Sequence, residues 1–247
     1  MNVVTSTDQI VRTVAAQPVQ LDAADRRPRA RPPRIVRVGL WLLPVYGAML
    51  AVSTLTHQPS FRTDFPGYAR YITTDIFLAS HLILTIGGAA LGSIGVVSAL
   101  LYLVRGRAGT TAYIGGAMTL AANFASTSVF GAAAFAQPAI GRAYLAGMDG
   151  VIELNADVYG PTLDAMAGAG ILLFVLGGIV FGTAIARTSR PLRWFGVVYV
   201  LAFVTFMVSG VFFPLGQTIS AAALAAVSAV VAWRLPRQDV ADEANGP

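Results

Sequence analysis

Six long apolar stretches, none of which contains Asp, Glu or Arg, constrain this chain more than any other feature of its sequence. They cover residues 38–56, 76–104, 112–135, 166–186, 194–213 and 215–233. About 20 mostly apolar residues in a helix cross the hydrocarbon core of a bilayer, where every backbone polar group must find a partner inside the protein. The sequence therefore predicts an all-α membrane protein, a bundle of six transmembrane helices.

The composition agrees and excludes several kinds of chemistry. Only 12 % of the residues are charged, whereas soluble domains carry about 25 %. The chain has no cysteine, which excludes disulfides, thiolate metal sites and a cysteine nucleophile. It has no lysine either, because all 17 basic residues are arginine, and this excludes a Schiff base. The net charge of +5 does not point to nucleic acid, since the arginines flank apolar spans.

The arginines predict the orientation of the helices. Most fall on one side of the predicted spans: Arg12, Arg26, Arg27, Arg29, Arg31, Arg34, Arg37, Arg105, Arg107, Arg187, Arg190, Arg193, Arg234 and Arg237. The other side holds only Arg62, Arg70 and Arg142. Because loops rich in arginine stay in the cytoplasm, both termini are predicted to be cytoplasmic. Trp41, Trp194 and Trp233 lie at the same ends of their spans, as expected of aromatic side chains at the headgroup layer.

The regions outside the spans are assigned as follows. Residues 1–37 are predicted to be a disordered basic cytoplasmic tail, 38–235 the six-helix domain, and 236–247 a second cytoplasmic tail. The external loop 136–165 is long enough that a short surface helix is expected within 142–156. Residues 213–216, which read FPLG, predict a tight turn between the last two helices, in which proline stops the helix and glycine supplies the turn.

Two of the spans share a glycine pattern. Residues 82–92 read LILTIGGAALG and residues 172–182 read LLFVLGGIVFG, so both contain L-x-x-x-x-G-G-x-x-x-G. Glycines four residues apart let membrane helices approach closely. The match is consistent with a duplicated two-helix unit, made of spans two-three and four-five. It is also consistent with coincidence, because glycine is common in membrane helices.

Polar residues gather in the outer half of the predicted bundle, and polar residues within a membrane are the first pointers to function. We interpret them as a pocket open to the outside, with four lining candidates: Asn123, Thr127, Ser209 and Gln217. His81 exchanges a proton near neutral pH, so His81 with Asp75 and Asp164 at the pocket mouth form candidate catalytic residues. The alternative is that the Ser and Thr hydroxyls bond to their own helices and serve only in packing. No spacing typical of a metal or haem site is present, so no cofactor is predicted.

The stretch 128–142, which reads SVFGAAAFAQPAIGR, together with 68–71 (YARY) and 80–82 (SHL), resembles a family of uncharacterised multi-pass membrane proteins of high-GC Gram-positive bacteria. The resemblance covers residues 57–235 and implies a location in the bacterial plasma membrane. It implies no activity for any residue. In size and hydropathy the chain is also similar to small membrane terpene cyclases, but no catalytic motif aligns.

Three functions are open on the sequence alone. The first is an accessory or partner-binding bundle with an outward-facing polar pocket, in contact with the lipid bilayer and with a membrane protein or an apolar small molecule. The second is an intramembrane enzyme that acts on an apolar or isoprenoid substrate by acid and base chemistry. The third is a small-solute permease. The predicted spans of this chain lack the charged residues and the broken helices that are typical of transporters, which counts against this function.

Overall fold

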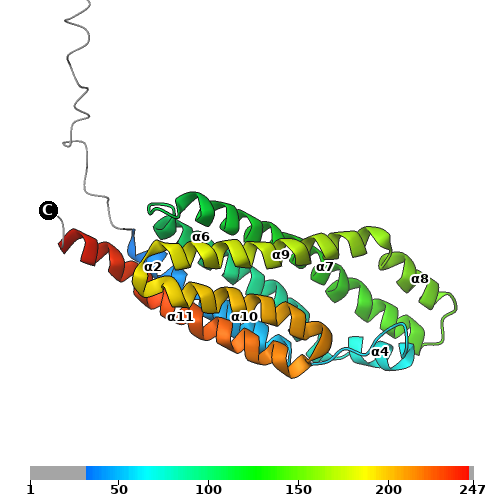
Figure 1. Ribbon diagram of the computed structural model, residues 1–247. Helices are drawn as coiled ribbons and strands as arrows, with labels where there is room; N and C mark the ends of the chain where they lie inside the picture. The colour runs from blue at the N-terminus through cyan, green and yellow to red at the C-terminus, as the bar shows by residue number, and fades with distance from the viewer. Residues whose placement is uncertain (1–31, 245–247) are drawn as a thin grey trace, which may run out of the picture. The chain divides into compact units, whose positions relative to one another are not determined.

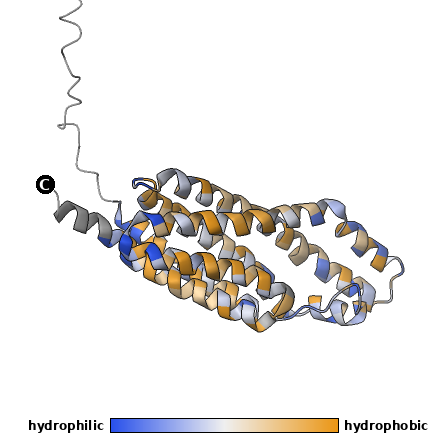
Figure 2. Ribbon diagram, viewed as in Figure 1, coloured by the Kyte–Doolittle hydropathy of each residue, from blue (hydrophilic) through white to orange (hydrophobic). Residues whose placement is uncertain are grey.

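The computed structural model describes residues 32–244, which form helices and no strands (Figure 1). Six of its helical segments are long and apolar enough to cross a membrane, as many as the sequence predicts: Arg34–Ser53, Asp75–Leu103, Gly109–Leu145, Pro161–Thr188, Arg190–Gly210 and Leu215–Arg237. The apolar colour covers the helices of the bundle, while hydrophilic residues gather at its two ends (Figure 2). Most of the predicted tail 1–37 lies outside the described residues.

The long helices form a closed ring. Neighbours in the ring are α3 (Leu42–Ser53), α6 (Gly88–Leu103), α7 (Gly109–Leu145), α9 (Pro161–Thr188), α10 (Arg193–Phe212) and α11 (Pro214–Ala244), in that order, and α11 packs against α3 to close it. The ring surrounds one large core that includes Phe181, Phe203 and Val231. A ring of this kind leaves its centre to be filled by side chains or by a cavity.

Glycines set the spacing between these helices. A Cβ atom added to Gly47 of α3 would lie 2.7 Å from the Ala225 Cα atom of α11, so only glycine permits this approach. The two matching motifs contact different partners: Gly92 of α6 faces the Tyr46 ring of α3, whereas Gly178 of α9 faces the Phe203 ring of α10. A duplication of spans two-three and four-five would place the first motif against α7, so these contacts give the duplication no support.

The first and second spans are each interrupted. Helix α2 (Arg34–Leu40) ends at Trp41 before α3 begins, because Pro44 has no N–H to donate to the Leu40 carbonyl and its ring crowds that oxygen. The second span consists of α5 (Asp75–Ala79), a π-helical segment η2 (Ser80–Gly87) and α6. Within η2 the Thr85 hydroxyl donates to the Ser80 carbonyl at 3.0 Å, five residues back. π-Helical turns occur frequently at functional sites.

The third helix is longer than predicted. We expected the span to end at residue 135, but α7 continues through Pro138 to Leu145. Its last turns pack against α4 (Phe65–Ile72), where a Cβ atom on Gly141 would lie 2.9 Å from the Ala69 carbonyl oxygen. This tertiary contact stabilises helical turns that sequence composition assigns to a loop.

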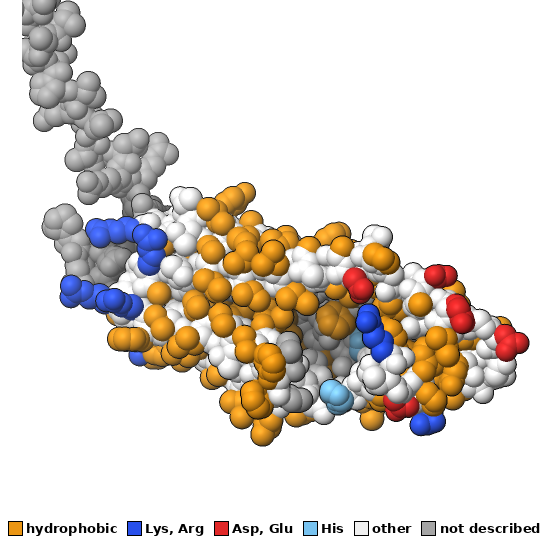
Figure 3. Space-filling model, turned by 45° about the vertical axis from the view of Figure 1, so that its right-hand side comes forward, with side chains coloured by type: hydrophobic (Ala, Val, Ile, Leu, Met, Phe, Trp, Pro, Cys, Tyr) orange, Lys and Arg blue, Asp and Glu red, His pale blue; other side chains and the backbone are white. Residues whose placement is uncertain are grey.

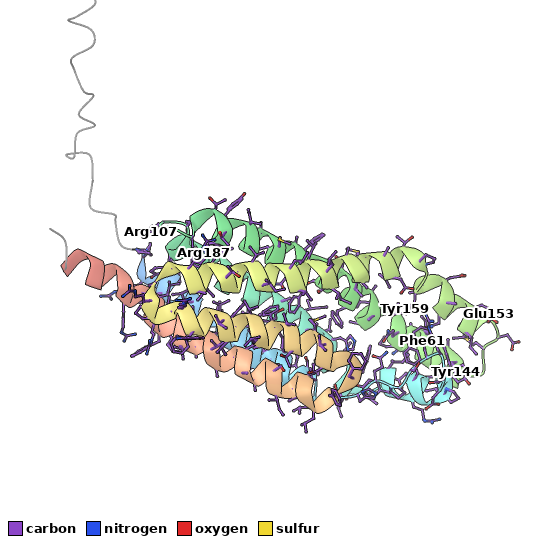
Figure 4. All side chains as sticks on the ribbon, in the orientation of Figure 1. Phe61, Arg107, Tyr144, Glu153, Tyr159 and Arg187 are labelled. Atoms are coloured by element: carbon purple, nitrogen blue, oxygen red, sulfur yellow. The ribbon has the colours of Figure 1, made fainter. Side chains whose placement is uncertain are left out.

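A second, smaller core lies at this end of the bundle, and we call the elements around it the cap: α4, residues 138–145 of α7, and α8 (Val151–Val158). Its buried residues include Phe65, Tyr68 and Val151. The Tyr68 hydroxyl donates to Asn155 Oδ1 at 3.3 Å and so links α4 to α8. Figure 4 shows the labelled residues Phe61, Tyr144 and Tyr159 together in this region.

The expected surface helix within 142–156 is present, but it is shifted. Gly147 ends α7 with a positive φ of 73°, and the Met148 N–H bonds to the Ala143 carbonyl at 3.1 Å, a Schellman arrangement. Gly150, also at positive φ, precedes α8. The helix therefore occupies 151–158 because two glycines reverse the chain before it.

The turn between α10 and α11 is tighter than predicted. Only Phe213 lies between the two helices, and Pro214 begins α11. Gly216 does not form the turn; it lies within α11, where a Cβ atom would be 2.9 Å from the Ser209 Oγ atom. Helix α11 also continues through Pro236 as far as Ala244, into the predicted tail 236–247.

Charge divides the two ends of the bundle, as Figure 3 shows. The end formed by the start of α7 and the end of α9 carries arginines, among them Arg107 and Arg187 (Figure 4). The cap end carries the carboxylates Asp64, Asp75, Asp149, Glu153, Asp157 and Asp164 with Arg62, Arg70 and Arg142. We call these the arginine end and the cap end.

Candidate functional site

A cavity of about 450 Å³ lies inside the ring, in the half nearer the cap. Every long helix of the ring contributes to its wall. Figure 3 shows a hollow in this half of the molecule, with histidine among the side chains around it. Its volume falls within the range of about 300–1,000 Å³ typical of small-molecule sites.

The wall combines two kinds of side chain. The polar ones are Ser53, Thr54, Thr56, His57, Gln58, Ser80, His81, Thr85, Ser126 and Gln217. The aromatic and aliphatic ones are Tyr46, Leu50, Tyr71, Ala89, Phe130, Ile171, Phe174, Phe206 and Met207. No Asp, Glu or Arg belongs to the wall as far as the described residues go. Such a surface fits a molecule that has both polar and apolar parts and no net charge.

His81 is held in one orientation by three contacts with two residues, Phe77 and Phe130. Its Nδ1 atom is 2.9 Å from the Phe77 carbonyl oxygen, its ring centroid is 4.1 Å from that of Phe77, and the Phe130 ring meets it edge-on at 5.5 Å. A carbonyl oxygen only accepts hydrogen bonds, so Nδ1 carries the proton and donates it. In the neutral ring, Nε2 is then a hydrogen-bond acceptor for whatever occupies the cavity.

Asn123 lies next to the cavity and bonds to residues of its wall, but it is not itself a lining residue. Its Oδ1 atom accepts from the Tyr46 hydroxyl at 3.2 Å, and its Nδ2 atom donates to the Ala89 carbonyl at 3.3 Å and to Ser93 Oγ at 3.1 Å. Tyr46 and Ala89 themselves line the cavity. Asn123 therefore joins α3, α6 and α7 where they form the floor.

Most hydroxyls in the spans bond within their own helix, as the packing alternative predicts. The donors and their carbonyl acceptors include Ser53 to Leu50, Thr119 to Gly115, Thr183 to Ile179 and Ser220 to Gly216. Thr54 also contacts Thr218 Oγ1 at 2.8 Å, a hydrogen bond between α11 and the chain after α3. Hydroxyls that donate to a carbonyl still accept, so those on the wall remain available to a ligand.

The structure brings together only part of the predicted site. His81 and Gln217 line the cavity, whereas Thr127 is half-buried and Ser209 is buried beside Gly216, both outside the wall. Asp75 and Asp164 are exposed in the first turns of α5 and α9, and neither belongs to the wall.

Sequence reasoning missed the aromatic half of the site. Phe130, Phe174 and Phe206 come from three different helices and resemble ordinary core residues in the sequence. It also missed η2, which carries Ser80, His81 and Thr85 on the wall. The one available signal was the polar cluster around His81 in an otherwise apolar span.

Within the described residues, no group of three or more His, Asp or Glu side chains is placed to hold a metal ion. The fold and cavity define a six-helix bundle with a ligand-sized, uncharged internal site. Comparison with protein-family models, with curated proteins and with solved structures finds no match to this chain.

Proposed function

We propose that the protein is a multi-pass protein of the bacterial plasma membrane that binds a small uncharged molecule in an outward-facing pocket. The observation that carries the proposal is the cavity of about 450 Å³ inside the helical ring, lined by both uncharged polar groups and aromatic rings. Packing alone favours a filled centre, because interiors are normally close-packed.

The orientation rests on charge. Arginines gather at the arginine end and carboxylates at the cap end, with six apolar helices between them. The positive-inside rule then assigns the arginine end to the cytoplasm. The cavity lies nearer the cap, so in this orientation it belongs to the outer half of the bilayer.

Single cysteines test the pocket, because the native chain contains none. Thr85→Cys and Ser126→Cys replace wall residues, and Ser98→Cys replaces a buried residue of α6 near the arginine end. A membrane-impermeant maleimide added to intact cells reacts with thiolates, which form only where water reaches. We expect the two wall positions to react and the Ser98 position to stay unlabelled. Failure of both wall positions, with labelling at a Gly150→Cys control, would overturn the proposal.

One observation favours a second candidate, an enzyme that acts on an apolar or isoprenoid substrate. The Phe77 carbonyl fixes the proton of His81 on Nδ1, which leaves Nε2 as the basic nitrogen of a side chain that lines the cavity. Binding without turnover separates the two functions. If a bound molecule is recovered chemically unchanged after prolonged incubation, the binding function holds and the enzyme does not.

A further inference from the structure

As far as the described side chains go, the wall of the pocket is open between α9 and α10, beside Ile171 and Gly210. Near the arginine end these helices pack tightly, with Gly178 against Phe203. The contact continues to Phe174, whose ring centroid is 4.6 Å from that of Phe203 and 6.4 Å from that of Phe206. On its other side α9 stays against α7, where Gly177 meets Thr119 and Gly170 meets Ala125 at Cβ contacts of 2.8 and 3.1 Å. Toward the cap, α9 and α10 diverge, as the two ribbons in Figure 1 show.

Two residues beside this divergence belong to the pocket and to the outer surface at once. Ile171 of α9 lines the cavity and is 52 % exposed, and Gly210 of α10 lines it and is also exposed. The neighbouring surface is apolar, with Leu172 and Val208 more than half exposed. Because both helices are apolar enough to cross a membrane, this opening faces lipid rather than water in the proposed orientation.

We infer that the pocket takes a neutral lipid alcohol, a long-chain molecule with a hydroxyl head group, and that this molecule enters sideways from the bilayer between α9 and α10. The inference rests on the proposed function, because it requires the bundle to lie in a membrane. The hydroxyl group donates to His81 Nε2, and the chain runs along Phe174 and Phe206 and leaves past Ile171.

The chemistry of the wall selects the head group. A hydroxyl group both donates and accepts, which matches an acceptor at His81 and the amide of Gln217. A phosphate head group would bring negative charge into a wall that has no arginine among its described residues, and a buried charge without a partner is strongly unfavourable. The aromatic and aliphatic residues of the wall provide the surface that an alkyl or isoprenoid chain requires.

The test uses purified full-length protein in lipid nanodiscs and a photoreactive long-chain alcohol that carries a diazirine in its chain. We expect crosslinks in α9 and α10, competed by the unmodified alcohol but not by its phosphate ester. Ile171→Trp narrows the opening and should slow labelling about tenfold or more. Leu172→Trp is the matched control, because Leu172 is the next residue, is 59 % exposed and does not line the pocket; it should label like the parent.

His81→Phe tests recognition of the head group. Phenylalanine keeps the ring contacts with Phe77 and Phe130 and removes the acceptor nitrogen. Loss of one hydrogen bond should weaken alcohol binding about tenfold, while labelling by an alkane probe of the same chain length stays unchanged. Equal affinity of parent and variant for the alcohol would overturn the assigned head group.

Two results would overturn the route and the ligand class. Equal labelling rates in Ile171→Trp and Leu172→Trp would exclude the opening between α9 and α10, and equal competition by the phosphate ester would exclude a neutral head group. If maleimide labels Thr85→Cys but the alcohol probe does not crosslink, the pocket exists and this inference is wrong. If neither reagent reacts, the proposed function fails as well.

Discussion

The Tyr46 hydroxyl donates to Asn123 Oδ1 at 3.2 Å, a buried hydrogen bond between α3 and α7. These residues are 77 positions apart in the sequence. Tyr46 faces the cavity on one side and Asn123 on the other, so this bond supports the floor of the pocket. An asparagine in an apolar span thus has a positioning role that its chemistry alone does not reveal.

Asn123→Ala should lower the free energy of unfolding by about 1–3 kcal/mol, because the buried Tyr46 hydroxyl loses its acceptor. Thermal unfolding in detergent measures the change. Ser128→Ala is the control, since the exposed Ser128 hydroxyl donates to the Phe124 carbonyl of its own helix and its loss should change stability little. In a Tyr46→Phe background, the loss of unfolding free energy caused by Asn123→Ala should be smaller. An equal loss in both backgrounds would show that the two residues do not stabilise each other.

Gly178→Ala should destabilise the bundle by about 1–3 kcal/mol, because a Cβ atom there overlaps the ring of Phe203, which is fully buried and packed against Phe174. Gly88→Ala is the matched variant from the other glycine motif. Its Cβ atom would lie 3.5 Å from Met49 and Tyr46, an ordinary contact, so its melting temperature should stay close to that of the parent. Equal melting of both variants would contradict the packing of α9 on α10.

Stability should fall at high pH through two tyrosines of the cap end. Burial raises the pKa of Tyr159 to about 12, and burial together with the nearby Tyr159 raises the pKa of Tyr68. In the unfolded chain both pKa values are about 10. The unfolded state therefore loses protons first, so the stabilisation is complete below pH about 10 and is lost as the pH rises through about 12.

The measurement compares melting temperatures of the parent and of the double variant Tyr68→Phe, Tyr159→Phe across this pH range. The double variant should lose less stability, because its cap has no phenol at these positions. The other tyrosines are common to both proteins and cancel in the comparison. Parallel curves would show that the cap tyrosines do not contribute.

Reporter fusions check the proposed orientation. Fusions that end at Gly106 or Ser189, both at the arginine end, should give cytoplasmic signals, and fusions that end at Gly67 or Gly150, at the cap end, should give external ones. An external signal at Ser189 would invert the second half of the chain and remove the outward-facing pocket.

The sequence was sufficient for the six helices, because apolar length is a local property of the chain. Arginine position predicted the orientation for the same reason. The sequence also pointed to His81 and Gln217, since a polar residue in an apolar span can be recognised without a structure. The end of α7 was predicted less well, because the turns after residue 135 are stabilised by the contact of Gly141 with α4, a segment far away in the sequence.

What only the tertiary structure decided is which residues meet. The π-helical register of η2 directs His81 toward the cavity, and the closed ring brings Phe130, Phe174 and Phe206 to the same space from three helices. The opening beside Ile171 lies where α9 and α10 diverge toward the cap. Hydropathy is a sum over neighbouring residues, so it can be calculated from the sequence alone. The pocket depends on the distances between helices, and close contacts at single glycines determine those distances.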